Sequence, residues 1–201
     1  MPLSKQHKAR TRERIIRSAG RVFRRVGFEV GGVDSVMAEA GLTRGGFYAH
    51  FPSKADLFAA VVGEDHGLIR LLAARQARSA GQWRVRTLRV LADYLHPAHL
   101  DEVAQGCSFA ALTADASRAS PAARAAYGQA FNDLVAQLLR RHGESADQAA
   151  ARADTKQRGA AVEVAALAIG TLIIAAALGS GPAARAALTG AWASVQQRMG
   201  R

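Results

Sequence analysis

The chain has 201 residues, with 27 lysines and arginines against 16 aspartates and glutamates, for a net charge of +11 at neutral pH. This length has room for one well-buried domain with a smaller one beside it, and a lone Cys107 excludes a disulfide framework. The positive charge is concentrated, because residues 1–54 hold 11 basic and 4 acidic side chains. A polyanionic partner is therefore expected for the N-terminal quarter.

The first predicted helix includes residues 10–26 and has two different faces. Arginines recur along one face at alternating steps of four and three, at Arg10, Arg14, Arg17, Arg21 and Arg24. The opposite face is apolar and consists of Ile15, Ile16, Ala19, Val22, Phe23 and Val26. We expect one face to pack against the protein and the other to meet phosphates, with a solvated charged surface as the alternative for any single arginine.

The next segment reads as two short helices joined by a tight turn. The first covers residues 33–40, with one apolar face made of Val33, Val36, Met37 and Ala40. Gly41 supplies the positive φ that ends a helix, and Thr43 is the expected cap of a second helix over residues 44–50. This helix stops there because Pro52 disfavours helical geometry at the residue before it.

So short a helix is not stable alone in water and depends on tertiary packing. Phe47 and Phe51 lie one helical turn apart and provide the expected apolar anchor, which leaves the other face to a partner. Ser53 then begins a third helix, with Asp56 in its first turn. The order of helix, turn, short helix and new helix predicts a helix-turn-helix.

Three segments carry a more specific likeness: RERIIRSAGRVFRRVGF at 12–28, VDSVMAEAGLTRGG at 33–46 and FYAHFPSKADL at 47–57. In order and spacing they resemble the DNA-binding domain of the TetR family of bacterial transcriptional regulators. Two positions depart from the family pattern. Gly32 stands where a capping Thr or Ser is common, at an expected cost of about 1 kcal/mol, and Gly46 stands where a side chain often meets bases.

The resemblance implies a DNA contact for several side chains. Hydroxyl, imidazole and ammonium donors are expected on backbone phosphates, from the matching positions Thr43, Tyr48, His50 and Lys54. Arg44 matches a base-reading position, where a guanidinium can bond a guanine edge bidentately. Gly45 and Gly46 are expected to approach the duplex closely or to donate backbone amides.

Beyond residue 54 the sequence keeps helical periodicity, and nothing alternates like a strand. Further helices are predicted over 53–79, 83–95, 107–118, 121–143, 145–178 with a possible bend at 153–159, and 182–199. The expected fold is all-α, with an N-terminal three-helix helix-turn-helix DNA-binding domain in residues 1–54. Residues 55–201 are expected to form a C-terminal helical effector-binding and dimerisation domain.

The resemblance also implies a homodimer, in which the last two helices pair with their copies in a four-helix bundle. The apolar surplus of residues 160–178 supports this pairing, as does the stripe of Leu188, Trp192, Val195 and Met199. A self-contained core is the alternative. A membrane span is disfavoured because Glu163 interrupts the apolar run and no second such segment accompanies it.

An effector pocket is expected among the middle helices, and a largely apolar wall suits a small hydrophobic or amphipathic molecule. The expected lining is Leu68, Leu72, Leu91, Tyr94, Leu95, Phe109, Leu112, Phe131 and Leu134, with Asp115 and Asn132 as further polar groups. Core packing is the alternative for each. The predicted helix over 53–79 is expected to couple the pocket to DNA as one rigid element, because it begins at Lys54.

Cys107 follows Gly106 at a predicted helix start, where the helix dipole favours a thiolate. Redox or electrophile sensing is therefore one interpretation, a thiol enzyme is a weaker one, and a buried inert cysteine is the alternative to both. A metal site at His96 and His99 is disfavoured because Pro97 lies between them. No enzymatic activity, metal or cofactor is expected.

These observations predict a ligand-responsive repressor that leaves a pseudo-palindromic operator when an effector binds. A basic architectural DNA-binding protein without an effector is the competing interpretation. A cytoplasmic location is expected, since the cysteine usage suits a reducing compartment and the first residues lack the apolar core of a signal peptide.

Overall fold

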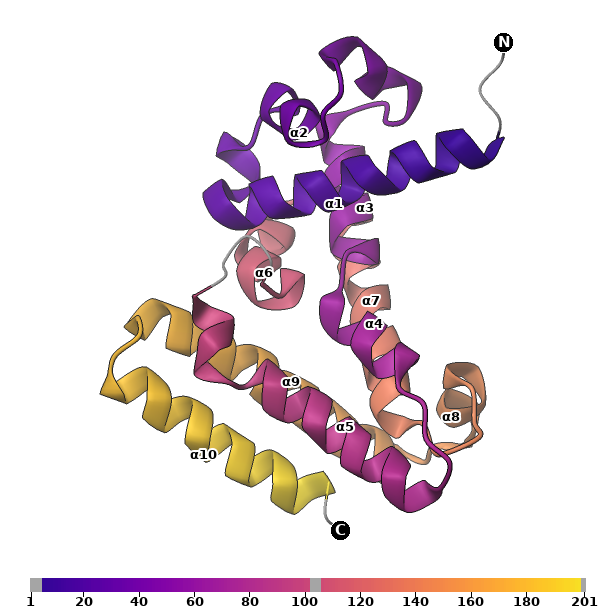
Figure 1. The fold of residues 1–201 in the computed structure, drawn as a ribbon, viewed down its shortest axis with the longest axis vertical. Coiled ribbons are helices and arrows are strands. Elements are labelled where there is room, and N and C mark those ends of the chain that lie inside the picture. Colours follow the sequence, from indigo (N-terminus) through magenta and orange to yellow (C-terminus); the bar gives the residue numbers. More distant parts are fainter. Residues whose placement is uncertain (1–4, 102–105, 200–201) are drawn as a thin grey trace. The chain divides into compact units, whose positions relative to one another are not determined.

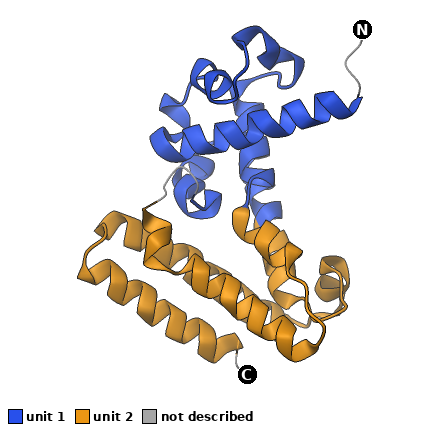
Figure 2. Ribbon diagram, in the orientation of Figure 1, with its two compact units in different colours: residues 1–66, 103–130 blue, residues 67–102, 131–201 orange. Residues whose placement is uncertain are grey.

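The computed structural model describes residues 5–101 and 106–199, which form helices and turns without a β-strand (Figure 1). The expected all-α fold is confirmed. The chain divides into two compact units, coloured separately in Figure 2: unit 1 has residues 1–66 and 103–130, and unit 2 has residues 67–102 and 131–201. This division describes packing, and the functional boundary at residue 54 stays a prediction.

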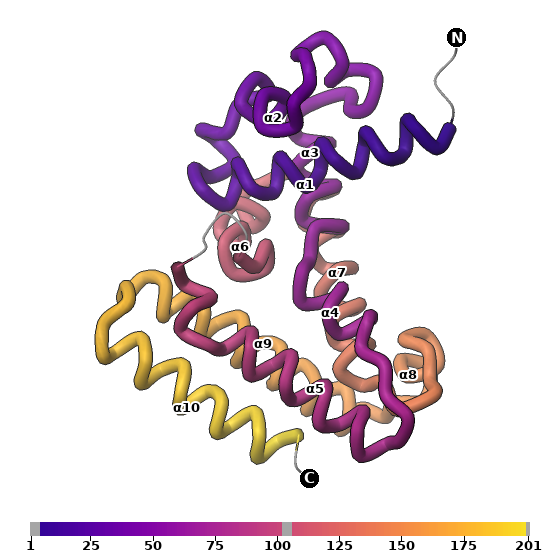
Figure 3. Tube along the Cα trace, viewed as in Figure 1, coloured from indigo at the N-terminus to yellow at the C-terminus, as the bar shows by residue number. Residues whose placement is uncertain are grey.

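Unit 1 is built around a long first helix. Its elements are α1 (Lys5–Val30), α2 (Val33–Glu39), the 3-10 helix η1 (Arg44–Ala49), α3 (Lys54–Glu64), α6 (Ser108–Arg118) and the first part of α7 (Pro121–Leu139). Helix α1 packs against α2, α3 and α6. The tube in Figure 3 follows the chain from α1 through α2 and the short turns into α3.

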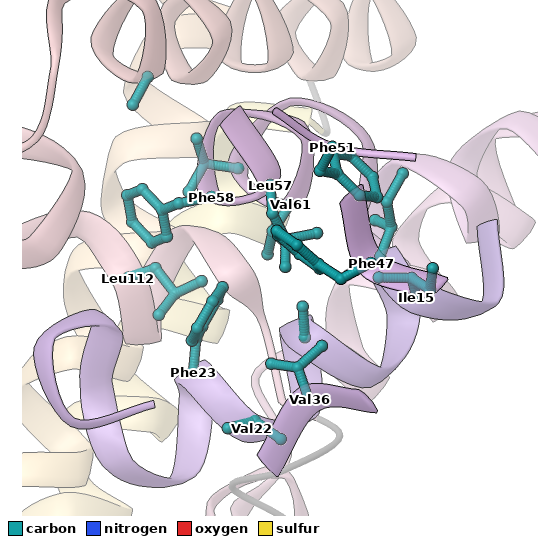
Figure 4. Close-up of a cluster of buried hydrophobic side chains, with 14 of the residues drawn as sticks. Ile15, Val22, Phe23, Val36, Phe47, Phe51, Leu57, Phe58, Val61 and Leu112 are labelled. Atoms are coloured by element: carbon teal, nitrogen blue, oxygen red, sulfur yellow. The ribbon is translucent and has the colours of Figure 1, made fainter. Parts of the chain in front are cut away.

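The core of unit 1 joins the apolar face of α1 to the helix-turn-helix (Figure 4). The Phe23 ring meets the rings of Phe28 and Phe58 edge to face, with centroids 5.8 and 5.7 Å apart. Each large apolar side chain buried here contributes about 1.5–3 kcal/mol. The expected apolar face of α1 is confirmed except at Val26, which is 47% exposed.

The predicted helix over 53–79 is wrong as a single element. Helix α3 ends at Glu64, Asp65 has non-helical φ and ψ of −95° and 67°, and a separate helix α4 covers Gly67–Ala74. Asp65 is held in this conformation by contacts distant in sequence: its carboxylate accepts a hydrogen bond from Arg24, and its carbonyl accepts one from the hydroxyl of Ser108. The rigid element expected to run from Lys54 to the pocket is therefore absent.

Unit 2 contains α4, α5 (Ala80–Tyr94), the 3-10 helix η2 (Pro97–Leu100), the rest of α7, α8 (Ala146–Arg152), α9 (Thr155–Leu178) and α10 (Pro182–Met199). The predicted helix over 145–178 is two helices, because Asp154 begins α9 with its own capping box to Gln157. Helices α9 and α10 pack along each other, and α10 also meets α5.

A buried arginine joins two helix ends inside unit 2. The Arg75 guanidinium donates to the carbonyls of Leu72 and Gln137, and it stacks on Trp83 with 4.1 Å between the guanidinium carbon and the ring centroid. Both carbonyls lie in the last turns of their helices, whose negative dipole ends offset the buried charge. Burial and, secondarily, the charge of Arg140 lower the pKa of Arg75 to about 10, so it stays charged at neutral pH.

Candidate nucleic-acid interface

Helix α2 ends in the turn that the sequence predicts. Val36 and Met37 are buried, while Asp34 and Ser35 are exposed. Gly41 has a φ of 63°, in the left-handed region that favours glycine. The first turn of α2 lacks a side-chain cap at Gly32, as the sequence indicates.

The segment after the turn is a 3-10 helix rather than the expected α-helix. Thr43 has extended backbone before η1, and its side chain does not cap the helix, so the expected hydroxyl cap is wrong. Phe47 is fully buried beneath η1, and its ring centroid lies 6.0 Å from that of Phe51. The predicted aromatic anchor is therefore present, and it fixes a segment too short to hold itself.

The opposite side of η1 is open. Tyr48 is 63% exposed, and its ring packs edge to face on Phe47. A Cβ added at Gly45 would meet no atom within 4 Å, and one at Gly46 would meet only the Met37 methyl, 3.7 Å away. Thr43, Arg44 and Gly45 are exposed with Tyr48, so the side chains and bare backbone expected at DNA share one short accessible segment.

Arg44 is held by an acidic neighbour. Its Nη1 lies 2.7 Å from Oδ2 of Asp34 on α2, and the two side chains are 65% and 66% exposed. An ion pair this exposed contributes about 0–1 kcal/mol. The Arg44 guanidinium can therefore leave Asp34 at little cost.

Lys54 lies at the start of α3, beside the end of α1. Its ammonium donates to the carbonyl of Glu29 over 3.0 Å and lies 4.6 Å from the centroid of the Phe28 ring. Ser53 caps the helix, as its hydroxyl accepts a hydrogen bond from the amide of Asp56. Lys54 thus lies at the start of α3 and is paired with no carboxylate of the described residues.

His50 lies at the end of η1 and is half-buried, and its Nδ1 is buried without a hydrogen-bond partner among the described residues. Burial is the main cause that lowers the pKa of His50, followed by the charges of Lys8, Arg12 and His7. These three residues belong to the first two turns of α1. The start of α1 therefore lies within electrostatic reach of the helix-turn-helix.

The expected row of phosphate-facing arginines on α1 is wrong in its second half. Arg24 is buried in the ion pair with Asp65, and Arg21 binds Glu39 at 2.7 Å. Arg25 binds the same carboxylate. The hydrogen bond from Arg25 is the main cause that lowers the pKa of Glu39, followed by the hydrogen bond from Arg21. These partners are distant in sequence, so helical periodicity alone could not identify them.

The residues expected to line an effector pocket belong to both units. Leu68, Leu72, Leu91, Tyr94, Leu95 and Leu134 are buried in unit 2, where Phe131 is half-buried and Asn132 is exposed. Phe109 and Leu112 are buried in unit 1, and the Asp115 carboxylate there accepts a hydrogen bond from the amide of Phe28. An open hollow of about 870 Å³ in unit 2 lies between the start of α9 and the end of α10, and none of these expected residues lines it.

Cys107 is buried, at 6% exposure, and immediately precedes α6. Its neighbour Ser108 accepts a hydrogen bond from Arg24 and donates one to the carbonyl of Asp65. The thiol thus adjoins the contacts that end α3.

Metal binding and membrane insertion are two other functions to compare with the structure. Among residues 5–101 and 106–199, no group of three or more His, Cys, Asp or Glu side chains has an arrangement that could hold a metal ion. Helix α9 is long and apolar enough to cross a membrane by length and composition, but the core helix of a soluble protein passes the same test.

Comparison with known proteins shows which family the helix-turn-helix resembles. Residues 15–61 match the family described as bacterial regulatory proteins, tetR family. A curated relative, the uncharacterized HTH-type transcriptional regulator YfiR of Bacillus subtilis (strain 168), is 37% identical over 71 residues, which cover 34% of this chain and 35% of that protein. The chain therefore spans about a third of the length of this relative.

Solved structures extend the likeness in fold to nearly the whole chain. The reduced form of NemR from E. coli aligns with a TM-score of 0.69 and 20% identity, over 94% of this chain and 97% of that chain. A putative TetR-family transcriptional regulator from Rhodococcus sp. aligns with a TM-score of 0.70 and 18% identity, over 95% of this chain and 99% of that chain. Residues 15–61 thus form a helix-turn-helix of the tetR family of bacterial regulatory proteins, and nearly the whole chain shares the fold of these solved structures.

Proposed function

We propose that the protein is a transcriptional regulator that binds operator DNA through α2 and η1, as a homodimer, and leaves it when a small molecule binds. The open face of η1 above the buried Phe47 anchor carries this proposal. It presents donors on a segment fixed by the core, the arrangement that a helix-turn-helix needs in a major groove. A non-enzymatic, cytoplasmic role is part of the same proposal.

Within this interface we assign different roles to different residues. Arg44 reads a base, because its guanidinium is exposed and only loosely held by Asp34. The phosphate-binding residues are Thr43, Tyr48, His50 and Lys54. Gly45 and Gly46 let the backbone come close to the duplex, since neither carries a side chain above η1.

The homodimer is proposed to form through α9 and α10. Apolar side chains remain exposed on α9, namely Val162, Ile173, Ile174 and Leu178. On α10, Leu188 and Val195 are instead buried within the protomer, so the expected apolar stripe of that helix is largely used inside unit 2. The dimer contact is therefore assigned mainly to α9, and it would bury a patch that is otherwise unfavourable in water.

The effector is proposed to be a small hydrophobic or amphipathic molecule bound among the middle helices of unit 2. Leu68, Leu72 and Leu91 would form apolar walls, with the Tyr94 hydroxyl as a polar group. Thermal-shift screening of such molecules would identify a ligand. Leu72→Ala should change the stabilisation by that ligand while DNA binding without it persists.

A thiol-based signal at Cys107 is a second proposal for sensing. It is favoured by the position of Cys107 beside Ser108, whose hydrogen bonds hold Asp65, and the structural neighbour NemR is described in a reduced form. Native thiol labelling followed by operator binding would test it. A thiol that does not react in the native protein would leave Cys107 as a core residue.

The decisive experiment is selection of genomic DNA fragments by the purified chain. A recovered pseudo-palindromic site, lost as a preference in Arg44→Ala, would support the proposal. Recovery without sequence preference at physiological salt would favour the architectural DNA binder, because phosphate contacts alone give strong binding without sequence discrimination.

A further inference from the structure

The buried face of α1 changes character toward the start of the helix. Over the core of unit 1 this face is apolar, with Ile15, Ile16, Ala19 and Phe23 buried. Steps of three and four residues back along the same face lead to Arg12, Lys8 and Lys5. The stripe that packs the core thus continues as a basic stripe in the first turns.

Arg12 fixes the position of this stripe. It forms two hydrogen bonds to the carboxylate of Glu64, at 2.8 and 2.7 Å, and its guanidinium lies 5.3 Å from the centroid of the Phe51 ring. Phe51 directly follows His50 at the end of η1. The second turn of α1 is therefore held against the end of the helix-turn-helix, with Lys8 one turn further out.

The charges beyond Arg12 are not neutralised within the described chain. Residues 5–12 contain no aspartate or glutamate, and no described carboxylate pairs with Lys5 or Lys8. Lys5 and Lys8 are exposed and His50 is half-buried, and the charge of Lys8 contributes to lowering the pKa of His50. This face continues the stripe that packs the core, lies beside the helix-turn-helix and carries cations in place of apolar groups. It is therefore complementary to a polyanion rather than to another apolar surface.

We propose that Lys5 and Lys8, together with His50, form a second phosphate-binding surface, the α1 surface, which binds the operator backbone outside the bases read by η1. The inference rests on the proposed function. It supplies contacts that η1 lacks, because Gly45 and Gly46 carry no side-chain donors. Contacts of this kind orient a protein on DNA without reading sequence.

Salt dependence of DNA binding tests the α1 surface, with Lys8→Ala as the variant and Arg84→Ala as the control. Arg84 lies on α5 in unit 2, is exposed and belongs to no proposed DNA-binding surface. Fluorescence anisotropy would use the site recovered by genomic selection and a scrambled duplex of equal length. Lys8→Ala should weaken both duplexes by the same factor and reduce the slope of log K against log salt by about 0.9 for each protomer, or about 1.8 for the homodimer, while Arg84→Ala leaves the slope unchanged.

A trimmed duplex locates the contact. When the flanking base pairs outside the recovered site are removed, Lys8→Ala should lose its effect while Arg44→Ala still abolishes sequence preference. If the wild-type chain prefers no sequence, the proposed function fails. If it does prefer one and the slopes of Lys8→Ala and Arg84→Ala agree, the α1 surface is overturned and Lys8 is a solvated charge. Circular dichroism of each variant checks the fold.

Discussion

Arg24 on α1 and Asp65 after α3 form an ion pair inside unit 1, with 2.8 Å between Nη1 of Arg24 and Oδ2 of Asp65. Both side chains are more than nine-tenths buried, at 7% and 5% exposure. Ser108 bridges the pair, accepting from Arg24 and donating to the Asp65 carbonyl. The end of α3 is thereby fixed to the helix that carries the α1 surface and to the start of α6.

Replacing Asp65 with alanine should strongly destabilise the protein. The change leaves the Arg24 charge buried without its carboxylate, which typically costs about 3–5 kcal/mol. Urea unfolding followed by circular dichroism would measure the loss. A loss close to that of an exposed-pair variant such as Glu13→Ala would show that water reaches the Arg24 site.

Gly20→Ala should destabilise the protein although alanine favours helices. A Cβ at residue 20 would lie 2.1 Å from Oδ2 of Asp65 and 2.9 Å from Nη1 of Arg24, so the ion pair must shift. Gly128→Ala in α7 is the control, because a Cβ there meets nothing within 4 Å. The control should gain up to about 1 kcal/mol from helix propensity, and equal gains in both variants would contradict the close approach at Gly20.

Arg44 and Lys54 should differ in what they contribute to DNA binding. Arg44→Ala should remove discrimination worth about 1–3 kcal/mol between the operator and a site mutated at one base pair. Lys54→Ala should weaken all duplexes alike. Asp34→Ala should strengthen binding, since it frees Arg44 and removes a negative charge near phosphates; electrophoretic shift assays on matched and mutated sites measure all three.

His50 should make the fold less stable in acid. Its pKa is lowered in the folded protein, so the unfolded chain binds the proton more readily, and stability declines as pH falls through the ordinary histidine range near about 6.5. The facing charges are Lys8, Arg12 and His7. Lys8→Ala should raise the pKa of His50 in an NMR titration, whereas a shift of the same size in Arg14→Ala would argue against a local effect of Lys8.

Ile173→Asp should convert the dimer to a monomer, because it places a charge in the exposed apolar patch of α9. Light scattering after size exclusion gives the mass, and far-ultraviolet circular dichroism checks the helices. Val85→Asp on α5 is the control, since Val85 is also apolar and 65% exposed. A dimer that survives the change in α9 would place the interface elsewhere.

Local chemistry made part of this structure predictable. Gly41 and Ser53 act through their own backbone or the next turn, so their roles could be inferred from a few neighbouring letters. The break after α3 could not, because its cause is a contact between Arg24 and Asp65, which are 41 residues apart. The 3-10 form of η1 was not predicted either, although its six residues include Gly45 and Gly46, which are poor α-helix formers.

The candidate site also contains residues that are predictable from local spacing and residues whose contacts depend on distant parts of the chain. The helix-turn-helix residues follow from spacing and lie together, whereas the arginines of α1 divide between internal carboxylates and solvent according to partners on other elements. The basic start of α1 was readable in principle, since Lys5, Lys8 and Arg12 keep the period of the core stripe.

The bare backbone at Gly45 has a consequence for how this regulator can diverge. Its φ lies outside the left-handed region and a Cβ would meet nothing within 4 Å, so a side chain there would not disturb the fold. Most mutations that create a new contact also reduce stability, but this position is free of that conflict. A duplicated copy of the gene could acquire a new operator preference by one codon change and remain as stable as its parent.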